Sequence, residues 1–592
     1  MALSGEEANH AEYVHEGPAP PSKVPHEPMG KKFSEDGISK GSSQDGTAPV
    51  KGSPVGRFGT WVVSWMRPGL GMFNESYYIF SVGNVKPIWQ EQYPSCWKDG
   101  VNCPATFLHA LDYSQVAGLF AGMICLGLIV DQIGRKWGSV STASIMFVAG
   151  ILLTAADGPS PHAVFAFLTA AQALFGFGCG GEFPVAAASA AERAESTDEL
   201  KGLRGQTTVL VFSMQGWGNI LNLAVLLFFL AVQGQTGPDY SFRALSVTWR
   251  MQYALGLLPI MYMLVYRIFY LKESAIWQEQ RRKEKEGRME VSSERRRERR
   301  RRLWLFVKNY WHRLVGAAVG WFAWDFYYYG NKLFQSEFIN VIHPGSNLLG
   351  LLEYNLLNSS VALFGYYFAA FTIDRIWMGR RRMQIAGFAA VFALFLACGL
   401  AFYSLTASAA ALQGFQAMYY ISSFFAQFVN ATTFLLASEL FPTENRGMAH
   451  GISAAVGKLG ALSADIIMGV VDDRMKFILS AAAGALGVLV TFVFIPEITS
   501  LDLKEGDTRW EMIKKGAGDS YTGEAVNPAN LSWFEGLLGV GHPYRKEVQR
   551  RKSKEMMCTL SGQQASGVPS SIDGQPGSGP VGQQASGQHE DA

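Results

Sequence analysis

Charged residues are scarce in this chain of 592 residues, since Asp, Glu, Lys and Arg together make up 17% of it. Hydrophobic residues make up 48%, and the mean hydropathy is positive. Soluble globular proteins carry about 25% charged residues. The composition therefore argues against a soluble enzyme and favours a protein with many membrane spans. The net charge of +2 gives no reason to expect a nucleic-acid partner.

Cysteine is also scarce, with six residues, which are too few for a disulfide scaffold at this length. No CxxC pair or Cys/His cluster has the spacing of a metal site, so we expect neither a metal nor a cofactor. No apolar segment occupies the extreme N-terminus, which argues against a cleaved signal peptide. No nucleophile–base pair or phosphate-cradling glycine loop stands out, so we expect no enzyme.

Apolar windows fill the chain between its two polar ends. A transmembrane helix needs about 20 mainly apolar residues to cross the hydrocarbon layer. Twelve windows of about this length qualify, at 64–88, 111–130, 138–155, 163–190, 207–232, 250–270, 314–340, 350–373, 384–404, 410–438, 448–470 and 477–495. The sequence therefore predicts an all-α membrane protein.

The connections rich in Lys and Arg all follow even-numbered windows, at 131–136, 193–204, 281–302, 375–382 and 439–446. Cytoplasmic loops carry the excess of basic residues, so both termini are expected in the cytosol. The loop with Cys96 and Cys103 then faces outward, where a disulfide and two free thiols are both permitted.

The longest connection holds twelve basic and five acidic residues between 281 and 302. We expect it to be a solvated helix or a disordered linker. Its charge either fixes the membrane topology or contacts anionic lipid. Each basic residue near the membrane surface contributes about 1 kcal/mol to the free energy of binding an anionic leaflet.

The two halves of the chain repeat two landmarks. Gly122 precedes Asp131 by nine positions and Gly365 precedes Asp374 by nine, so the aspartates lie 243 residues apart. An Arg–Gly pair begins at 204 and again at 446, an offset of 242. Duplicated halves that hold a substrate between them at mid-membrane are typical of secondary transporters.

The segment GLIVDQIGRK at 127–136 resembles the cytoplasmic loop motif of the major facilitator superfamily, and DRIWMGRRR at 374–382 resembles its echo in the second half. The resemblance implies twelve transmembrane helices in two pseudo-symmetric six-helix bundles. It also implies that Asp131, Arg135, Asp374 and Arg380 latch the cytoplasmic gate. The alternative is that they only enforce topology, which does not require an acid.

We therefore divide the chain into five regions. These are a disordered cytosolic tail at 1–56, a six-helix bundle at 57–271, a basic cytosolic linker at 272–312, a second bundle at 313–497 and a largely disordered cytosolic tail at 498–592.

Ionisable side chains within the spans are costly, so each is a candidate functional residue. Glu75, Glu182, Asp325 and Lys458 fall in the windows, as do the polar Gln215 and Asn430. Trp321, Asp325 and Tyr329 follow one another at intervals of four, which places them along one face of a helix. The alternative is an aromatic stripe between helices, but Asp325 favours a site.

The motifs WFAWDFYYYG, GGEFP, FSMQGWG, NATTF and ELFPTENRGMAHGISAAVGKLGA together resemble the phosphate:proton symporter family, over roughly residues 60–500. The resemblance implies an anion site made by Gln215, Trp321, Asp325, Tyr329, Asn430 and Lys458. It implies proton coupling by Glu182, Asp325 and Glu75. Because a carboxyl group can donate to an oxyanion only when it is protonated, proton and anion binding would be coupled.

Two departures from the family pattern bear on the substrate. Phe183 stands where the family usually has tyrosine, and Glu75-Ser76-Tyr77-Tyr78 stands where the family has two acids in the pattern DxYD. We expect proton-driven import of inorganic phosphate across the plasma membrane. The alternatives are a symporter of an organic anion, such as a glycerophosphodiester or a carboxylate, and a nutrient-sensing receptor built like a transporter.

Overall fold

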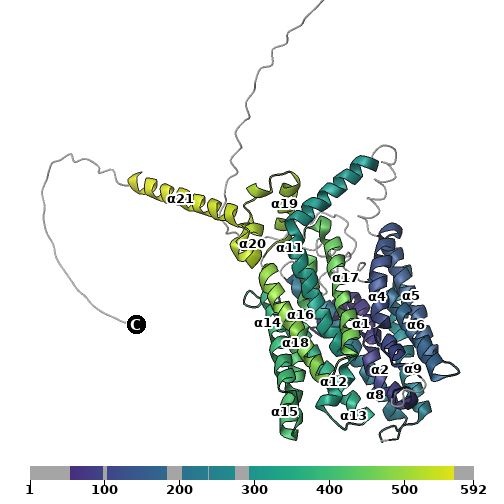
Figure 1. Ribbon diagram of the computed structural model, residues 1–592. Coiled ribbons are helices and arrows are strands. Elements are labelled where there is room, and N and C mark those ends of the chain that lie inside the picture. The colour runs from purple at the N-terminus through teal and green to yellow at the C-terminus, as the bar shows by residue number, and fades with distance from the viewer. Residues whose placement is uncertain are drawn as a thin grey trace, which may run out of the picture. The chain divides into compact units, whose positions relative to one another are not determined.

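The structure is a computed structural model that describes residues 54–97, 103–182, 203–237, 239–271, 273, 292–499 and 501–565. The described residues from Gly59 onward form one compact unit. All regular elements in the described ranges are helices (Figure 1). The helices of the first half are α1 (Pro54–Ile79), α2 (Ser81–Gln92), α3 (Pro94–Trp97), α4 (Ala105–Ile133), α5 (Arg135–Ala155), α6 (Pro161–Gly180), α8 (Arg204–Val232) and α9 (Phe242–Phe269).

The second half is built in the same way. Its helices are α11 (Ser292–Leu333), α12 (Gln335–Ile342), α13 (Leu348–Thr372), α14 (Arg380–Leu400), α15 (Phe402–Thr406), α16 (Ala409–Glu439), α17 (Thr443–Met468) and α18 (Asp473–Phe494). A C-terminal segment follows, with α19 (Leu503–Lys514), three 3₁₀ turns, α20 (Trp533–Leu537) and α21 (His542–Ala565).

Each of the twelve expected spans corresponds to a helix or to a pair of consecutive helices. Eight helices of the described residues are long and apolar enough to cross a membrane, namely α5, α6, α8, α9, α14, α16, α17 and α18. The other four expected spans coincide with α1 and α2, α4, α11 and α12, and α13. The expected fold of twelve transmembrane helices is therefore confirmed.

The first window, 64–88, predicts one continuous helix. In the structure this window is divided, because α1 ends at Ile79 and α2 begins at Ser81. The Ser81 hydroxyl donates to the Tyr78 carbonyl at 2.6 Å and so competes with the helical hydrogen bonds there. Pro87 in α2 cannot donate to the carbonyl of Gly83. The hydroxyl of Ser336 donates to that carbonyl at 2.8 Å instead, from α12 in the other half.

The repeat inferred from sequence appears in the packing of the helices. Gly122 of α4 lies against the backbone of Phe177 in α6, and Gly365 of α13 lies against the backbone of Phe424 in α16, with no room for a side chain at either glycine. The packing of α5 on α9 in the first half matches that of α14 on α18 in the second. Between the halves, α4 packs on α17 and α13 packs on α8.

The two ends of this helical assembly are distinct. We call the end at which α8 and α14 begin the basic end, because Arg204 and Arg380 lie there. The opposite end, at which α4 begins, carries a disulfide between Cys96 and Cys103, and we call it the disulfide end. The sequence left open whether these two cysteines are bonded.

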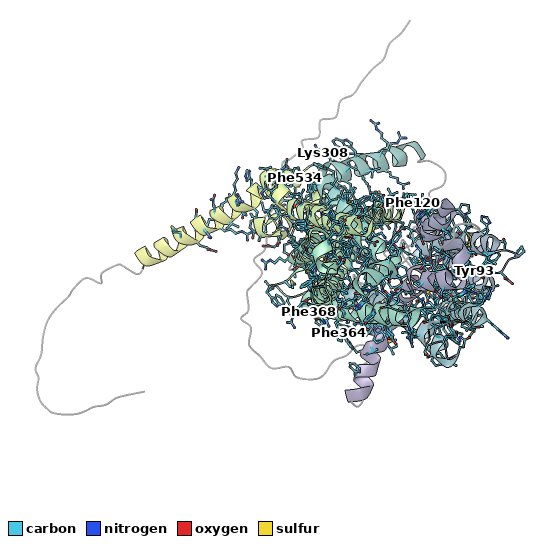
Figure 2. The ribbon with its side chains drawn as sticks, turned by 60° about the horizontal axis from the view of Figure 1, so that its bottom comes forward. Tyr93, Phe120, Lys308, Phe364, Phe368 and Phe534 are labelled. Carbon is cyan, nitrogen blue, oxygen red and sulfur yellow. A yellow bond between two sulfur atoms is a disulfide. The ribbon has the colours of Figure 1, made fainter. Side chains whose placement is uncertain are left out.

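Within the tail that was expected to be largely disordered, residues 501–565 form helices and turns, and α19 and α20 pack on the second half. Trp510 of α19 is buried against the rings of Phe306 and Tyr310 in α11. These contacts give α11 an apolar face beyond its expected span, and they account for a helix that already begins at Ser292 within the expected linker. Figure 2 shows Lys308 of α11 and Phe534 of α20 in this region, where the C-terminal segment packs on α11.

A buried ion cluster joins α20 to α11. Glu535 lies 2.7 Å from Nε of Arg313 and 3.0 Å from Nε2 of His312, and it also closes a capping box with Ser532. Burial raises the pKa of Glu535, but Arg313 and His312 outweigh it and hold that pKa well below its usual range. Phe534 packs beside the cluster, between Trp311 and Phe494.

Replacing Glu535 with Gln should release the C-terminal segment from α11. The change keeps the shape of the capping box but leaves the Arg313 guanidinium buried without its counter-charge, which costs about 3–5 kcal/mol. Protease cleavage within residues 501–538 in isolated membranes measures the release. The pKa of Glu535 is depressed, so its ion pairs contribute their full stabilisation of the docked segment at every pH above the ordinary carboxyl range. The resistance of the wild-type protein to the protease should therefore not change between pH 7 and pH 5.

Glu547→Gln is the matched control, since Glu547 makes only a surface pair with Arg551 on α21. Such a pair contributes about 0.3–0.5 kcal/mol, so this variant should resist the protease like wild type. Equal resistance of the Glu535 and Glu547 variants would show that the buried cluster does not hold the segment.

Candidate functional site

A buried ion pair forms the centre of the candidate site. Oδ2 of Asp325 in α11 lies 3.0 Å from Nζ of Lys458 in α17, and both side chains are almost fully buried. Gly457 and Gly460 let α17 approach α11 closely, because they lie against the Trp321 ring and the Phe322 carbonyl. The close approach brings Lys458 within reach of the carboxylate.

The ion pair continues into a polar chain that crosses between the two halves. Lys458 Nζ donates to the Tyr329 hydroxyl at 2.7 Å, and the Tyr329 hydroxyl donates to Glu75 Oε1 at 3.3 Å. Glu75 belongs to α1 of the first half, whereas the other three residues belong to the second. The other oxygen of Glu75, Oε2, is buried without a hydrogen-bond partner in the described part of the chain.

A second polar cluster also crosses between the halves. Gln215 Oε1 of α8 accepts from the Tyr366 hydroxyl of α13 at 2.6 Å and from Nδ2 of Asn430 in α16 at 2.9 Å. Asn430 Nδ2 also lies 2.6 Å from the Tyr366 oxygen and 3.1 Å from Gln427 Oε1. The two amides predicted from sequence are therefore in direct contact, and Tyr366 is a further member that the sequence did not indicate.

Aromatic rings connect the two clusters. Trp321 lies edge-on to Phe434 at 6.2 Å and to the His450 ring at 5.3 Å, and Phe434 packs on Phe212, which approaches Tyr366. Both ring nitrogens of the buried His450 lack a hydrogen-bond partner within the described ranges. His450 lies in the long motif quoted above, but nothing in its spacing pointed to this position beside Trp321.

Glu182, a predicted proton-coupling residue, forms an ion pair with Arg267 of α9. Two guanidinium nitrogens of Arg267 each lie 2.6 Å from one carboxylate oxygen of Glu182, and Thr142 donates to the same carboxylate. Arg267 stands out as a charge within an apolar window, but nothing in the sequence indicated that Glu182 is its partner. Phe183, the next residue, lies outside the described residues.

The predicted gating residues of the second half lie at the contact between the halves at the basic end. Asp374 Oδ1 lies 2.8 Å from Nη1 of Arg380, and its two oxygens accept from the backbone N–H groups of Gly205 and Gln206. Asp374 thus caps the N-terminus of α8, where the helix dipole favours a negative charge. Nothing is described of the side chains of Asp131 and Arg135, their counterparts in the first half.

Glu439, at the end of α16, extends this contact. Its carboxylate pairs with Arg380 at 3.2 Å and with Arg204 of α8, so one buried acid bridges arginines from both halves. The sequence did not single out Glu439 or Arg204 as gating residues, although both lie in the motifs that it did single out. At this end, ion pairs and a helix cap hold the two halves together.

The Asp325–Lys458 pair can be tested by a double-mutant cycle on thermal unfolding of the purified protein. Asp325→Ala and Lys458→Ala should each cost about 3–5 kcal/mol, because each leaves one buried charge without a partner. The double variant should cost much less than the sum of the two. Lys308→Ala, which removes an exposed lysine stacked on Trp304, is the control and should have little effect. A double variant whose loss of stability equals the sum of the two single losses would contradict the pairing.

Comparison with known proteins gives consistent matches. Residues 104–510 match the family described as "Sugar (and other) transporter". Glycerophosphoinositol permease 1 of Candida albicans is 28% identical over 75% of this chain and 80% of its own length. Probable inorganic phosphate transporter 1-6 of Arabidopsis thaliana is 27% identical over 76% of this chain and 94% of its own.

Among solved structures, a D-xylose–proton symporter has the same fold. It superimposes with a TM-score of 0.57 at 18% identity, and the match covers 75% of this chain and 99% of the symporter.

Proposed function

Because this chain belongs to the sugar (and other) transporter family, we propose that it is a proton-coupled carrier that imports inorganic phosphate by alternating access. Phosphate transporters of plants are among its relatives over about three quarters of the chain. The observation that carries the proposal is the buried Asp325–Lys458 pair of the second half, which Tyr329 links to Glu75 of the first half. A cation at that position can hold an anion midway through the membrane.

Proton coupling follows from competition for the Lys458 ammonium. When Asp325 is ionised, it neutralises Lys458, and an anion gains little by entering. When Asp325 takes a proton, Lys458 is left with a buried charge that an anion can neutralise. Binding of the anion therefore favours the protonated acid, and loss of the proton favours release. Tyr329 and Glu75 extend this competition to the first half through their hydrogen bonds.

The second polar cluster supplies neutral donors to the same anion. Gln215 and Asn430 offer amide N–H groups, and the Trp321 indole offers one more. In the present arrangement, the amides and Tyr366 satisfy one another. An arriving oxyanion can accept from Asn430 Nδ2 and the Tyr366 hydroxyl, so these two donors stay satisfied on binding, whereas Gln215 Oε1 gives up the hydrogen bonds that it accepts from them.

The ion pairs at the basic end form the latch of the cytoplasmic gate in this proposal. With Asp374 on the N-terminus of α8 and Glu439 between Arg204 and Arg380, that end is closed. Opening breaks the contact between α8 and the second half. Asp131 and Arg135 have the corresponding role in the first half by the symmetry of the repeat.

We propose further that the basic end faces the cytosol and that the carrier works in the plasma membrane with both termini inside. Positive-inside topology supports this orientation. The run 281–302 then adjoins the anionic leaflet, where exposed arginines such as Arg300 can contact lipid headgroups. Its first part, 281–291, lies outside the described residues.

A glycerophosphodiester is the second candidate substrate. Carriers named for glycerophosphoinositol in two yeasts are among the relatives. Tyr78 occupies the position of the second acid of the DxYD pattern, and it is buried between the rings of Phe175 and Tyr253. One acid fewer beside the site, together with Phe183 in place of tyrosine, suits a ligand with a larger and less charged body.

Uptake of radiolabelled phosphate in a host without phosphate carriers tests the proposal. We expect uptake that a protonophore abolishes and that arsenate inhibits more strongly than glycerophosphoinositol does. Stronger inhibition by glycerophosphoinositol, with uptake of that compound itself, would select the second candidate. Failure to take up either anion under an inward proton gradient would contradict the proposal.

Asp325→Asn should separate binding from coupling. The amide keeps the shape of the carboxyl group but carries no titrating proton, so we expect exchange of labelled phosphate to persist while accumulation falls to the external concentration. Asp239→Asn, at an exposed loop position, is the control and should accumulate normally. Accumulation by Asp325→Asn equal to wild type would move the coupling role to another acid.

A further inference from the structure

A second ion cluster joins the two halves at the disulfide end. Lys86 of α2 pairs with Asp112 of α4 at 2.9 Å and with Glu337 of α12 at 3.2 Å. Lys476 of α18 pairs with Glu337 at 2.6 Å and with Asp473 at 3.0 Å. Glu337 thus bridges a lysine from each half, as Glu439 bridges two arginines at the basic end. This cluster holds the disulfide end closed.

Asp465 lies beside this cluster and is the unusual member of the region. It follows Lys458 by two turns of α17 and is 3% exposed. Both of its carboxylate oxygens are buried and lack a hydrogen-bond partner among the residues that the structure describes. A buried carboxylate without partners is strongly unfavourable, so this closed arrangement requires the neutral acid.

No lysine or arginine of the described residues forms a hydrogen-bonded ion pair with Asp465. Asp112 and Lys86 are the charged groups that act on it, and Lys86 already pairs with two carboxylates. Further ionisable groups on the packed helices near this end include His109 of α4 and Lys332 of α11. The ring of His109 lies at Gly469, and the Lys332 ammonium donates to Gln335 at 2.9 Å. On α16, no charged residue precedes Glu439.

The position of Asp465 connects its charge to the contact between the halves. α17 packs on α4, which carries Asp112. If Asp465 were ionised, two carboxylates would oppose each other across this contact, with only Lys86 to offset them. Opening the disulfide end separates the two acids and lets water solvate Asp465. Charge on Asp465 thus favours the open end, and its neutralisation favours the closed end.

We propose that Asp465 is a second proton-binding site, at which a proton from the side of the disulfide end permits that end to close. This inference rests on the proposed proton-coupled carrier and adds a step to it. The proton that closes the gate binds two helical turns from Lys458, on the same helix that carries the anion site. Closure after anion binding therefore requires a proton at Asp465 in addition to the one at Asp325.

Ser336 provides a reporter for this closure, because it is buried and its hydroxyl contacts the Gly83 carbonyl of the other half. We would introduce Ser336→Cys and measure its reaction rate with a hydrophilic maleimide in lipid nanodiscs, without substrate. The protein without this substitution measures the labelling of the native cysteines, and that rate is subtracted. Because thiol reactivity itself changes with pH, each rate is divided by the rate of the same introduced thiol in the Asp465→Asn background.

The normalised rate should rise about tenfold between pH 5 and pH 8, which corresponds to about 1.4 kcal/mol in the closing equilibrium. Asp473→Asn is the matched control, since Asp473 pairs only with Lys476 in the same cluster and its side chain is 48% exposed. In the Asp473→Asn background the rise should remain. Asp465→Glu, which keeps a titrating acid, should also show it.

A normalised rate that does not change with pH would overturn the inference. A rise that Asp473→Asn abolishes would also overturn it, because the ion cluster and not Asp465 would then carry the pH dependence. The labelling needs no substrate, so it remains decisive for Asp465 if the carried anion is not phosphate. Conversely, failure of the uptake assay would leave the pH dependence of labelling intact.

Discussion

The polar arrangement between the two halves depends on one buried charge, the Lys458 ammonium. An isolated ammonium in the interior of a helical bundle is strongly unfavourable, so it must always have a negative partner. In this structure the partner is Asp325, and the same ammonium holds Tyr329, which reaches Glu75 in the other half. A cation with one obligatory partner is a natural coupling device, because an arriving anion and the resident carboxylate exclude each other.

The two ends of the molecule repeat a common design around this centre. At each end an acid of the second half, Glu439 or Glu337, bridges basic residues that belong to different halves. Both sets of ion pairs are formed, so the structure represents a closed carrier. The ends differ in their dependence on protons. At the basic end Asp374 and Glu439 are paired with arginines, whereas at the disulfide end Asp465 has no hydrogen-bond partner among the described residues and requires a proton.

Much of this architecture could be predicted from the sequence, because it depends on properties that are local in the chain. Apolar windows, basic loops and repeated glycines indicated twelve helices in two similar halves, and Asp325 and Lys458 stood out as charges in apolar segments. The partners of several charges could not be predicted. Arg267 reaches Glu182, and Asp465 lies within electrostatic range of Asp112, only because particular helices pack together. Docking of α19 and α20 depends on a few buried aromatic residues in a polar segment, such as Trp510, and these leave no periodic signal in the sequence.

The central claim is that an anion replaces Asp325 as the partner of Lys458 only when Asp325 takes a proton. Calorimetric titration of the purified carrier with phosphate, in buffers of different ionisation enthalpy, measures the number of protons taken up on binding. The difference between wild type and Asp325→Asn cancels the protonation of phosphate itself. We predict that wild type takes up about one proton more per bound anion than Asp325→Asn does. Equal proton uptake by the two proteins, with phosphate bound by both, would contradict the account.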